Sequence, residues 1–137
     1  MSIERKGDLG MGESLNKFKQ IKKNMPLILA NDTKNHFIKG FRQGGGQTDK
    51  GKWIPRKKKE KGGNRGILVY RGRLWKSIKI KSATFNSTVV GSVGVKYAER
   101  HNEGLAGMPQ REFIGKSKVL EAQITKTIEK QLIEIFK

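Results

Sequence analysis

The stretch from Val95 to Ser117 holds the residues whose types and spacing come nearest to a chemical site in this sequence. His101 and Glu103 have the His-x-Glu spacing of zinc deaminases, in which a Glu works beside a metal-bound water. Those enzymes need further Cys or His ligands, whereas this chain has no cysteine and only His36 as a second histidine. The sequence therefore predicts no catalytic residue and no metal site, and His101 is expected to donate a structural hydrogen bond.

Gly115, Lys116 and Ser117 resemble the end of a phosphate-binding P-loop. That motif requires a glycine five positions before Gly115, where this chain has Gln110, and no apolar strand leads into the loop. No nucleotide or other cofactor is therefore expected, and the chain is predicted not to be an enzyme. Gly115 is expected to form a tight turn before a helix that Ser117 caps.

Charge is the second feature that bears on function. The formal net charge is +18, and the segment 50–81 holds thirteen Lys or Arg residues against one acid, a net charge of +12 (13 − 1). Such a block attracts nucleic acid or an acidic protein surface through a salt-sensitive interaction without sequence preference. The residues expected to contact a partner or DNA are Trp53, Arg56, Lys57, Lys58, Lys59 and Lys61.

The two tryptophans permit two interpretations. Trp53 and Trp75 flank the densest basic run, where they could stack on the bases of a single strand. Alternatively, each anchors its own loop to the hydrophobic core. Anchoring is the preferred interpretation, because aromatic and basic residues do not alternate regularly.

Three helical patterns and one hairpin are expected to position these residues. Ser14 is the expected N-cap of the first helix, and Asn24 before Pro26 predicts a restart or a kink. A helical pattern then runs over 27–41, and three glycines end it. The last helix follows Ser117 and carries an apolar stripe at Leu120, Ile124, Ile128 and Leu132, extended by Ile135 and Phe136.

The hairpin is predicted from period-two alternation. Ile78 and Ile80 alternate with Ser77, Lys79 and Lys81, so this strand has an apolar face and a mainly basic face. After a turn at residues 86–87 the pattern continues, and one face of the antiparallel pair is expected to lie on the helices. The positions that continue it are Val89, Gly91, Val93 and Val95.

Composition sets the domain organisation. A chain of 137 residues is expected to make one domain, 1–137. Residues 43–66 contain seven glycines and the run RKKKEK, and they are expected to form a flexible basic arm that orders on contact with a partner. The expected class is α+β: N-terminal helices and a long C-terminal helix packed on a small antiparallel β-sheet, with a long Gly-rich basic loop. With 17 glycines the core should be thin, so packing against neighbouring copies would add stability. The absence of cysteine fits a reducing cytoplasm, and no apolar segment predicts secretion or membrane insertion.

In their order and spacing, these elements resemble the phage virion-morphogenesis family, the tail-completion proteins of Mu-like and related tailed phages. The resemblance covers nearly the whole chain. The residues that carry it are Trp53, Pro55, Ile67, Leu68, Gly72, Arg73, Leu74, Ser77, Ile78, Val90, Gly91, Tyr97, Ala98, His101, Gly104, Pro109, Arg111, Phe113, Gly115 and Ser117. Trp75 and the large basic excess depart from the family pattern.

The resemblance implies an α+β structural protein of the virion, which completes the tail and joins it to the DNA-filled head. Copies are expected to form a homo-oligomeric ring at the neck or connector, for instance of six, around the channel for DNA. Expected partners are neighbouring neck and tail proteins and the DNA in the channel, with no membrane; assembly takes place in the cytoplasm of the host bacterium. Four residues are expected to fix the loop that presents the ring contact, with Arg111 clamping a carbonyl or carboxylate. They are Tyr97, His101, Arg111 and Phe113.

Two other functions remain open at the level of sequence. A free-standing basic nucleic-acid-binding protein would explain the charge, although no helix-turn-helix, zinc-finger or RNA-binding motif is present. A hydrolase built on His101 and Glu103 would need a nucleophile arrangement that the sequence does not offer. Within the phage assignment, tail completion and the neighbouring role of tail terminator are not distinguished, and the basic surface could face DNA or protein.

Overall fold

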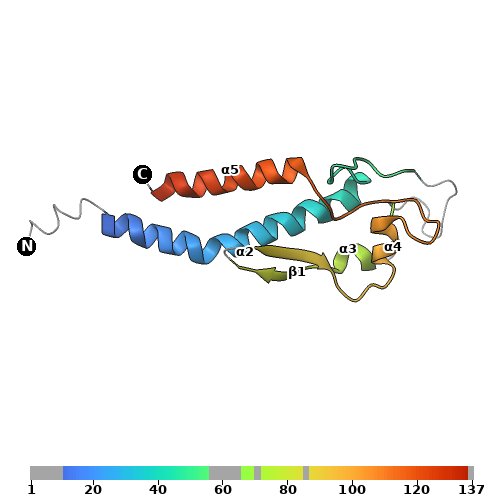
Figure 1. The fold of residues 1–137 in the computed structure, drawn as a ribbon, viewed down its shortest axis with the longest axis horizontal. Coiled ribbons are helices and arrows are strands. Elements are labelled where there is room, and N and C mark those ends of the chain that lie inside the picture. The colour runs from blue at the N-terminus through green and yellow to red at the C-terminus, as the bar shows by residue number, and fades with distance from the viewer. Residues whose placement is uncertain (1–10, 56–65, 70–71, 85–86, 136–137) are drawn as a thin grey trace, which may run out of the picture.

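The computed structural model describes residues 11–55, 66–69, 72–84 and 87–135 and has the predicted α+β architecture. Two helices run lengthwise, and in the view of Figure 1 the C-terminal helix and a two-stranded antiparallel hairpin border the longer helix along different edges. The elements in chain order are α2 (Met11–Gln43), α3 (Arg73–Lys76), β1 (Ile78–Ala83), β2 (Thr88–Ser92), α4 (Ala98–Glu103) and α5 (Lys118–Ile135). Within the described residues, no helix combines the length and apolarity needed to cross a bilayer.

The N-terminal helical segment differs from the sequence prediction, because it is one helix and not two. α2 begins at Met11, so Ser14 lies inside it and is not its N-cap, and it continues through Pro26. Proline removes one backbone hydrogen bond and crowds the preceding turn, so it bends a helix that packing holds together. Figure 1 shows α2 bent near its middle. Buried side chains on both sides of the proline, Met25 before it and Ala30 after it, keep the two halves in one helix.

The hairpin is confirmed, but its inward face differs from the prediction for the second strand. Ile78 pairs with Ser92 and Ile80 pairs with Val90, so these four residues share the face toward α2. Val89 therefore points outward and is 46% exposed, where the sequence pattern had placed it on the apolar face. The register shifts between Ile80 and Ser82, and this β-bulge turns the end of β1 while the ladder continues. The inward face is set by cross-strand pairing, which period-two counting within one strand does not reveal.

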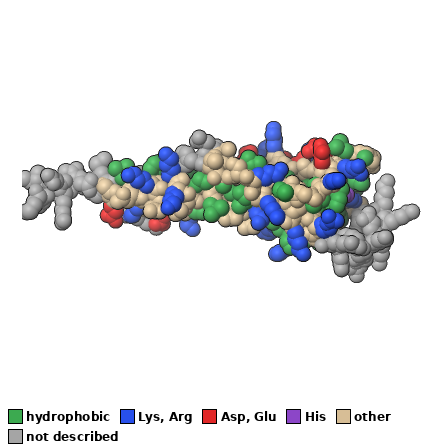
Figure 2. Space-filling view, turned by 90° about the horizontal axis from the view of Figure 1, so that it is seen from below, with side chains coloured by type: hydrophobic (Ala, Val, Ile, Leu, Met, Phe, Trp, Pro, Cys, Tyr) green, Lys and Arg blue, Asp and Glu red, His purple; other side chains and the backbone are tan. Residues whose placement is uncertain are grey.

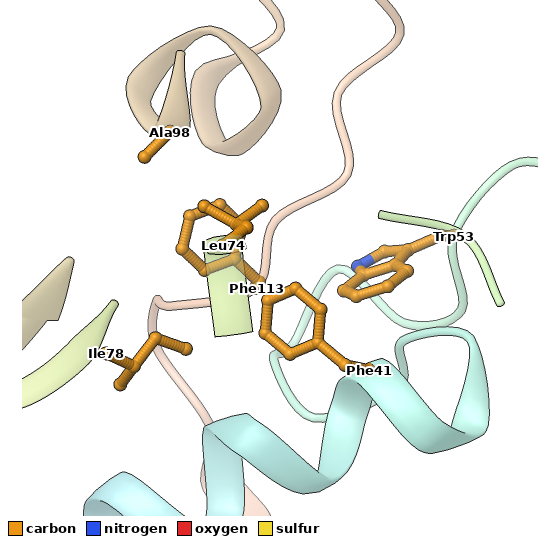
Figure 3. Packing of buried hydrophobic residues seen from close by; sticks show 6 residues of the cluster. All are labelled: Phe41, Trp53, Leu74, Ile78, Ala98 and Phe113. Atoms are coloured by element: carbon orange, nitrogen blue, oxygen red, sulfur yellow. The ribbon is translucent and has the colours of Figure 1, made fainter. Parts of the chain in front are cut away.

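The hydrophobic core is small and is assembled from separate segments. Its buried side chains turn toward one another from α2, the loop after α2, α3, β1, α4 and the segment before α5 (Figure 3). The ring of Phe41 lies 5.4 Å from that of Trp53 at 73° and 5.6 Å from that of Phe113, measured between ring centroids. Edge-to-face aromatic pairs of this kind add specificity beyond the buried area. The core residues are Phe41, Trp53, Leu74, Ile78, Ala98 and Phe113.

The loop that follows α2 is folded as far as residue 55. Its two ends run antiparallel: Gly46 N donates to the carbonyl of Gly51 at 3.0 Å, and Trp53 N donates to that of Gly44 at 3.0 Å. At Gly45 the backbone has φ of 94°, and a Cβ would lie 2.6 Å from Trp53 Cδ1, so the turn requires glycine. Residues 44–55 therefore belong to the folded domain without a partner, unlike the arm expected over 43–66. Residues 56–65 of that arm lie outside the described residues.

Candidate assembly surface

The segment between α4 and α5 is organised by one side chain, that of Asn102. Its Oδ1 accepts hydrogen bonds from the backbone N–H groups of Phe113 at 2.9 Å and Ile114 at 3.0 Å, and its Nδ2 donates to the Ile114 carbonyl at 3.0 Å. Gln110 Nε2 donates to the Asn102 carbonyl at 3.1 Å. An asparagine amide can do this because it carries an acceptor oxygen and an N–H donor group side by side. Asn102 thus folds residues 110–114 back onto α4.

Arg111 and Trp53 join this segment to the loop after α2. Arg111 Nε donates to the carbonyl of Ile54 at 3.0 Å, and Trp53 Nε1 donates to the carbonyl of Glu112 at 2.9 Å. Arg111 N also donates to the His101 carbonyl at 2.8 Å. The Arg111 side chain is 9% exposed, and a buried guanidinium needs such partners. The two loops are therefore held together by reciprocal side-chain to backbone hydrogen bonds.

The backbone N–H groups at the N-terminus of α5 find hydrogen-bond acceptors from two places in the chain. Ser117 Oγ accepts from Leu120 N at 3.1 Å, which confirms the predicted N-cap. Asp49, in the loop after α2, accepts from Lys118 N through Oδ1 at 2.9 Å, and its own N–H donates to the Lys116 carbonyl at 2.7 Å. A carboxylate at this position also complements the helix dipole. The start of α5 is thereby tied to the loop that α2 positions.

His36 completes this junction from α2. Its Nε2 donates to the carbonyl of Gln47 at 2.7 Å, and Gln47 Nε2 donates back to the His36 carbonyl at 2.7 Å. Ser117 Oγ lies 3.3 Å from the same imidazole nitrogen. All these partners are structural groups of the protein, so the described geometry gives His36 a packing role between α2, the following loop and α5.

The four residues predicted to fix the loop architecture lie together. Phe113 is in the core, Arg111 clamps the Ile54 carbonyl, and Tyr97 packs edge-on against His101 with ring centroids 5.8 Å apart at 88°. Tyr97 is 37% exposed and so lies at the surface of this cluster. Sequence reasoning missed the residues that connect the cluster, Asn102, Asp49 and Gln47. The signal for them was weak, because Asn, Asp and Gln side chains form hydrogen bonds to the backbone in many settings.

The residues predicted to contact a partner or DNA divide into two groups. Trp53 is 6% exposed and forms part of the core, which contradicts the prediction that it contacts a partner or DNA. The structure matches the preferred interpretation, in which the indole anchors its loop. The other five, Arg56, Lys57, Lys58, Lys59 and Lys61, lie outside the described residues.

Replacing Asn102 with alanine is expected to lower the free energy of unfolding by about 1 to 3 kcal/mol, because two backbone N–H groups and one carbonyl lose their partner. Urea unfolding measures the loss. Asn31→Ala, the same substitution at an exposed position of α2, is the matched control and should change stability by less than about 0.5 kcal/mol. Equal stabilities for the two variants would show that Asn102 does not organise the segment.

An apolar groove lies between the first half of α2, the second half of α5 and the tip of the hairpin. Its volume is about 310 Å³. The apolar stripe of α5 lines it, and burial varies along the helix: Leu120 and Ile135 are buried, whereas Leu132 is 40% exposed. The groove is therefore an incompletely covered part of the domain interior. Its apolar lining residues are Phe18, Ile21, Met25, Pro26, Leu29, Ile124, Ile128 and Leu132.

Among residues 11–55, 66–69, 72–84 and 87–135, no three His, Cys, Asp or Glu side chains are placed to hold a metal ion.

Comparison with protein-family models, curated proteins and solved structures finds no match to this chain. Function is therefore argued from the residues and their geometry.

Proposed function

We propose that this chain is a structural phage virion protein that completes the tail and joins it to the head. The observation that carries the proposal is the ordered set of residues, from Trp53 to Ser117, that resembles the virion-morphogenesis family. Many of these residues have a packing or turn role in the structure, such as Trp53, Leu74, Phe113 and the helix cap Ser117. The resemblance thus rests on residues that define a fold, which supports its use as a guide to function.

Self-association is part of the proposal, as a homo-oligomeric ring at the neck or tail end. The support is a small core beside an open apolar groove, since apolar surface left uncovered in one copy is commonly covered by another. In such a ring, the groove of one copy would be filled by a different surface of the next copy. Such head-to-tail contacts generate rings when the rotation between copies closes.

The partners in this proposal are neighbouring neck and tail proteins, with DNA passing through the joint. Assembly takes place in the cytoplasm of the host bacterium, and the finished protein resides in the virion. No chemical step is assigned to it, and the side chains with unusual polar environments, such as Arg111 and His36, serve packing. The protein is proposed to act through its surfaces alone.

The second candidate function is a free-standing nucleic-acid-binding protein. The observation that favours it is the net charge of +18, which exceeds what solubility requires of a small domain. The two candidates predict different effects of removing the protein, because a joining protein is needed for particle assembly whether or not the purified protein binds DNA. Complete, infectious particles from a strain without the protein would favour the second candidate.

Reversing the charge of the basic arm is expected to abolish joining of heads to tails. The variant carries Glu at positions 56–59 and 61 in place of Arg56, Lys57, Lys58, Lys59 and Lys61, and complementation of a disrupted gene measures the yield of infectious particles. A matched control places five Glu on other exposed lysines, with an equal change in net charge. Circular dichroism should show an intact fold in both variants. A normal yield from the arm variant would contradict the assigned role.

The matched control uses lysines on the two long helices, outside residues 56–61. All five are exposed in the structure. If both variants lose infectivity equally, total charge matters and the arm has no special part in joining. The control lysines are Lys19, Lys23, Lys39, Lys126 and Lys130.

A further inference from the structure

The outer face of the hairpin is a basic surface created by the strand geometry. Ile78 is buried and Ile80 half-buried, so the alternate residues Lys79 and Lys81 point away from the core and are exposed. β2 contributes Val89 and Gly91 to the same face, which adds no opposing charge. The face therefore presents positive charge without an acidic neighbour on either strand.

Further basic residues flank the hairpin in the sequence on both sides. Arg73 and Lys76 lie on α3, immediately before β1, and Lys96 follows β2; all three are exposed. From residue 66 to residue 98 the sequence contains no Asp or Glu. Figure 2 shows Lys and Arg side chains spread over this side of the molecule, with acidic side chains at its left end and along its upper edge on the right. We define the basic hairpin face as Arg73, Lys76, Lys79, Lys81 and Lys96.

Gly91 leaves room for the Lys81 side chain on this face. It lies opposite Lys79 across the ladder, and a Cβ at Gly91 would sit 2.9 Å from Cε and 3.1 Å from Nζ of Lys81. The Lys81 side chain thus crosses the space that a side chain at position 91 would occupy. The β-bulge between Ile80 and Ser82 re-aims the strand at this point, as bulges commonly do. Lys79 and Lys81 are two like charges on one strand, and a bound anion would relieve their repulsion.

The chemistry of this face fits the phosphate backbone of duplex DNA. Association of copies is proposed at the apolar groove; for this charged face a second copy, with 12 acidic against 30 basic residues, complements the lysines less well than a row of phosphates does. A two-stranded ribbon matches the width of the DNA major groove, and lysines neutralise phosphates as point charges. The strands present no Asn, Gln or Arg on the outer face that would read a base edge. Binding should therefore lack sequence preference.

We propose that the basic hairpin face binds the phosphate backbone of duplex DNA, with Lys79 and Lys81 at its centre. This inference rests on the proposed function for the identity of that DNA, which would be the molecule passing through the head–tail joint. It goes further by naming a contact surface within the folded domain, separate from the arm at residues 56–61. The two surfaces can be tested independently.

The test measures binding of the full chain to a fluorescein-labelled 30-base-pair duplex of mixed sequence over a series of salt concentrations. The double variant Lys79→Gln/Lys81→Gln removes two phosphate contacts, so the slope of log K against log salt should fall by about 2. The matched control is Lys126→Gln/Lys130→Gln on the exposed side of α5, with the same change in net charge. Its slope should remain close to that of the unchanged chain.

The outcomes separate this inference from the proposed function. An unchanged slope in the Lys79/Lys81 variant, an equal drop in the control, or no binding of duplex DNA by the unchanged chain at low salt would overturn the inference. In the last case an acidic protein neighbour becomes the occupant to test. Particle assembly is scored separately: loss of joining on gene disruption supports the proposed function whether or not the purified chain binds DNA through this face.

Discussion

Replacing Trp53 with alanine is expected to lower the free energy of unfolding by about 3 to 5 kcal/mol, the range for a buried aromatic side chain. The indole is 6% exposed, packs edge-on against Phe41 and closes the loop after α2 over Gly45. Its loss also leaves the Glu112 carbonyl without the indole N–H donor. Because the total stability of a small domain is about 5 to 15 kcal/mol, this variant should be close to unfolding at room temperature.

Trp53→Phe is the matched control for this result. It keeps most of the apolar ring but cannot donate to Glu112, so it isolates the hydrogen bond, which contributes about 0.5 to 1.5 kcal/mol. Chemical denaturation followed by circular dichroism serves both variants, since neither retains the Trp53 fluorescence. If Trp53→Ala were as stable as the unchanged chain and lost only DNA binding, Trp53 would be a contact residue and the core described above would be wrong.

The second large effect is expected at the groove, where Leu132→Asp should dissociate the proposed oligomer. Leu132 lines the groove and is 40% exposed in the single chain, so a charge there is tolerated before assembly. Covering that carboxylate with another copy would forfeit about 2 kcal/mol of apolar burial and add a desolvation cost. The dissociation constant between copies should therefore rise by about 30-fold or more. Analytical ultracentrifugation over a concentration series measures it.

Ile133→Asp is the matched control, because Ile133 is the next residue and is 59% exposed but does not line the groove. It introduces the same charge on the same helix. The account expects Ile133→Asp to keep the distribution of oligomers while Leu132→Asp shifts it to single chains. If both variants associate like the unchanged chain, the groove is not covered by a second copy and the support it gives to ring formation is lost.

Local patterns were sufficient to predict part of the fold, but not the short helices α3 and α4. The α+β class, the hairpin over residues 78–92 and the Ser117 cap of α5 all follow from spacing and capping chemistry within a few residues. The errors arose where contacts between residues far apart in the sequence decide the local structure. α2 continues through Pro26 because apolar side chains before and after the proline are buried. Val89 faces outward because β2 takes its register from β1.

The junction around Arg111 could be predicted only in part. Its aromatic and basic members stand out by residue type, and a carbonyl partner for Arg111 was expected, but no local pattern identifies that carbonyl as Ile54, 57 residues away. The same holds for Asp49, which satisfies an N–H of α5 from a loop 69 residues earlier. Such contacts are set by how the loops meet in space. Composition shows that polar partners are needed and leaves open which residues supply them.

Electron microscopy of particles from a producing strain with this gene disrupted tests the central claim most directly. The account predicts DNA-filled heads that accumulate apart from tails, and restoration of joined particles when the intact gene is supplied. Complete, infectious particles from the disrupted strain would contradict the assignment to tail completion and head–tail joining. That result would favour the free-standing nucleic-acid-binding function.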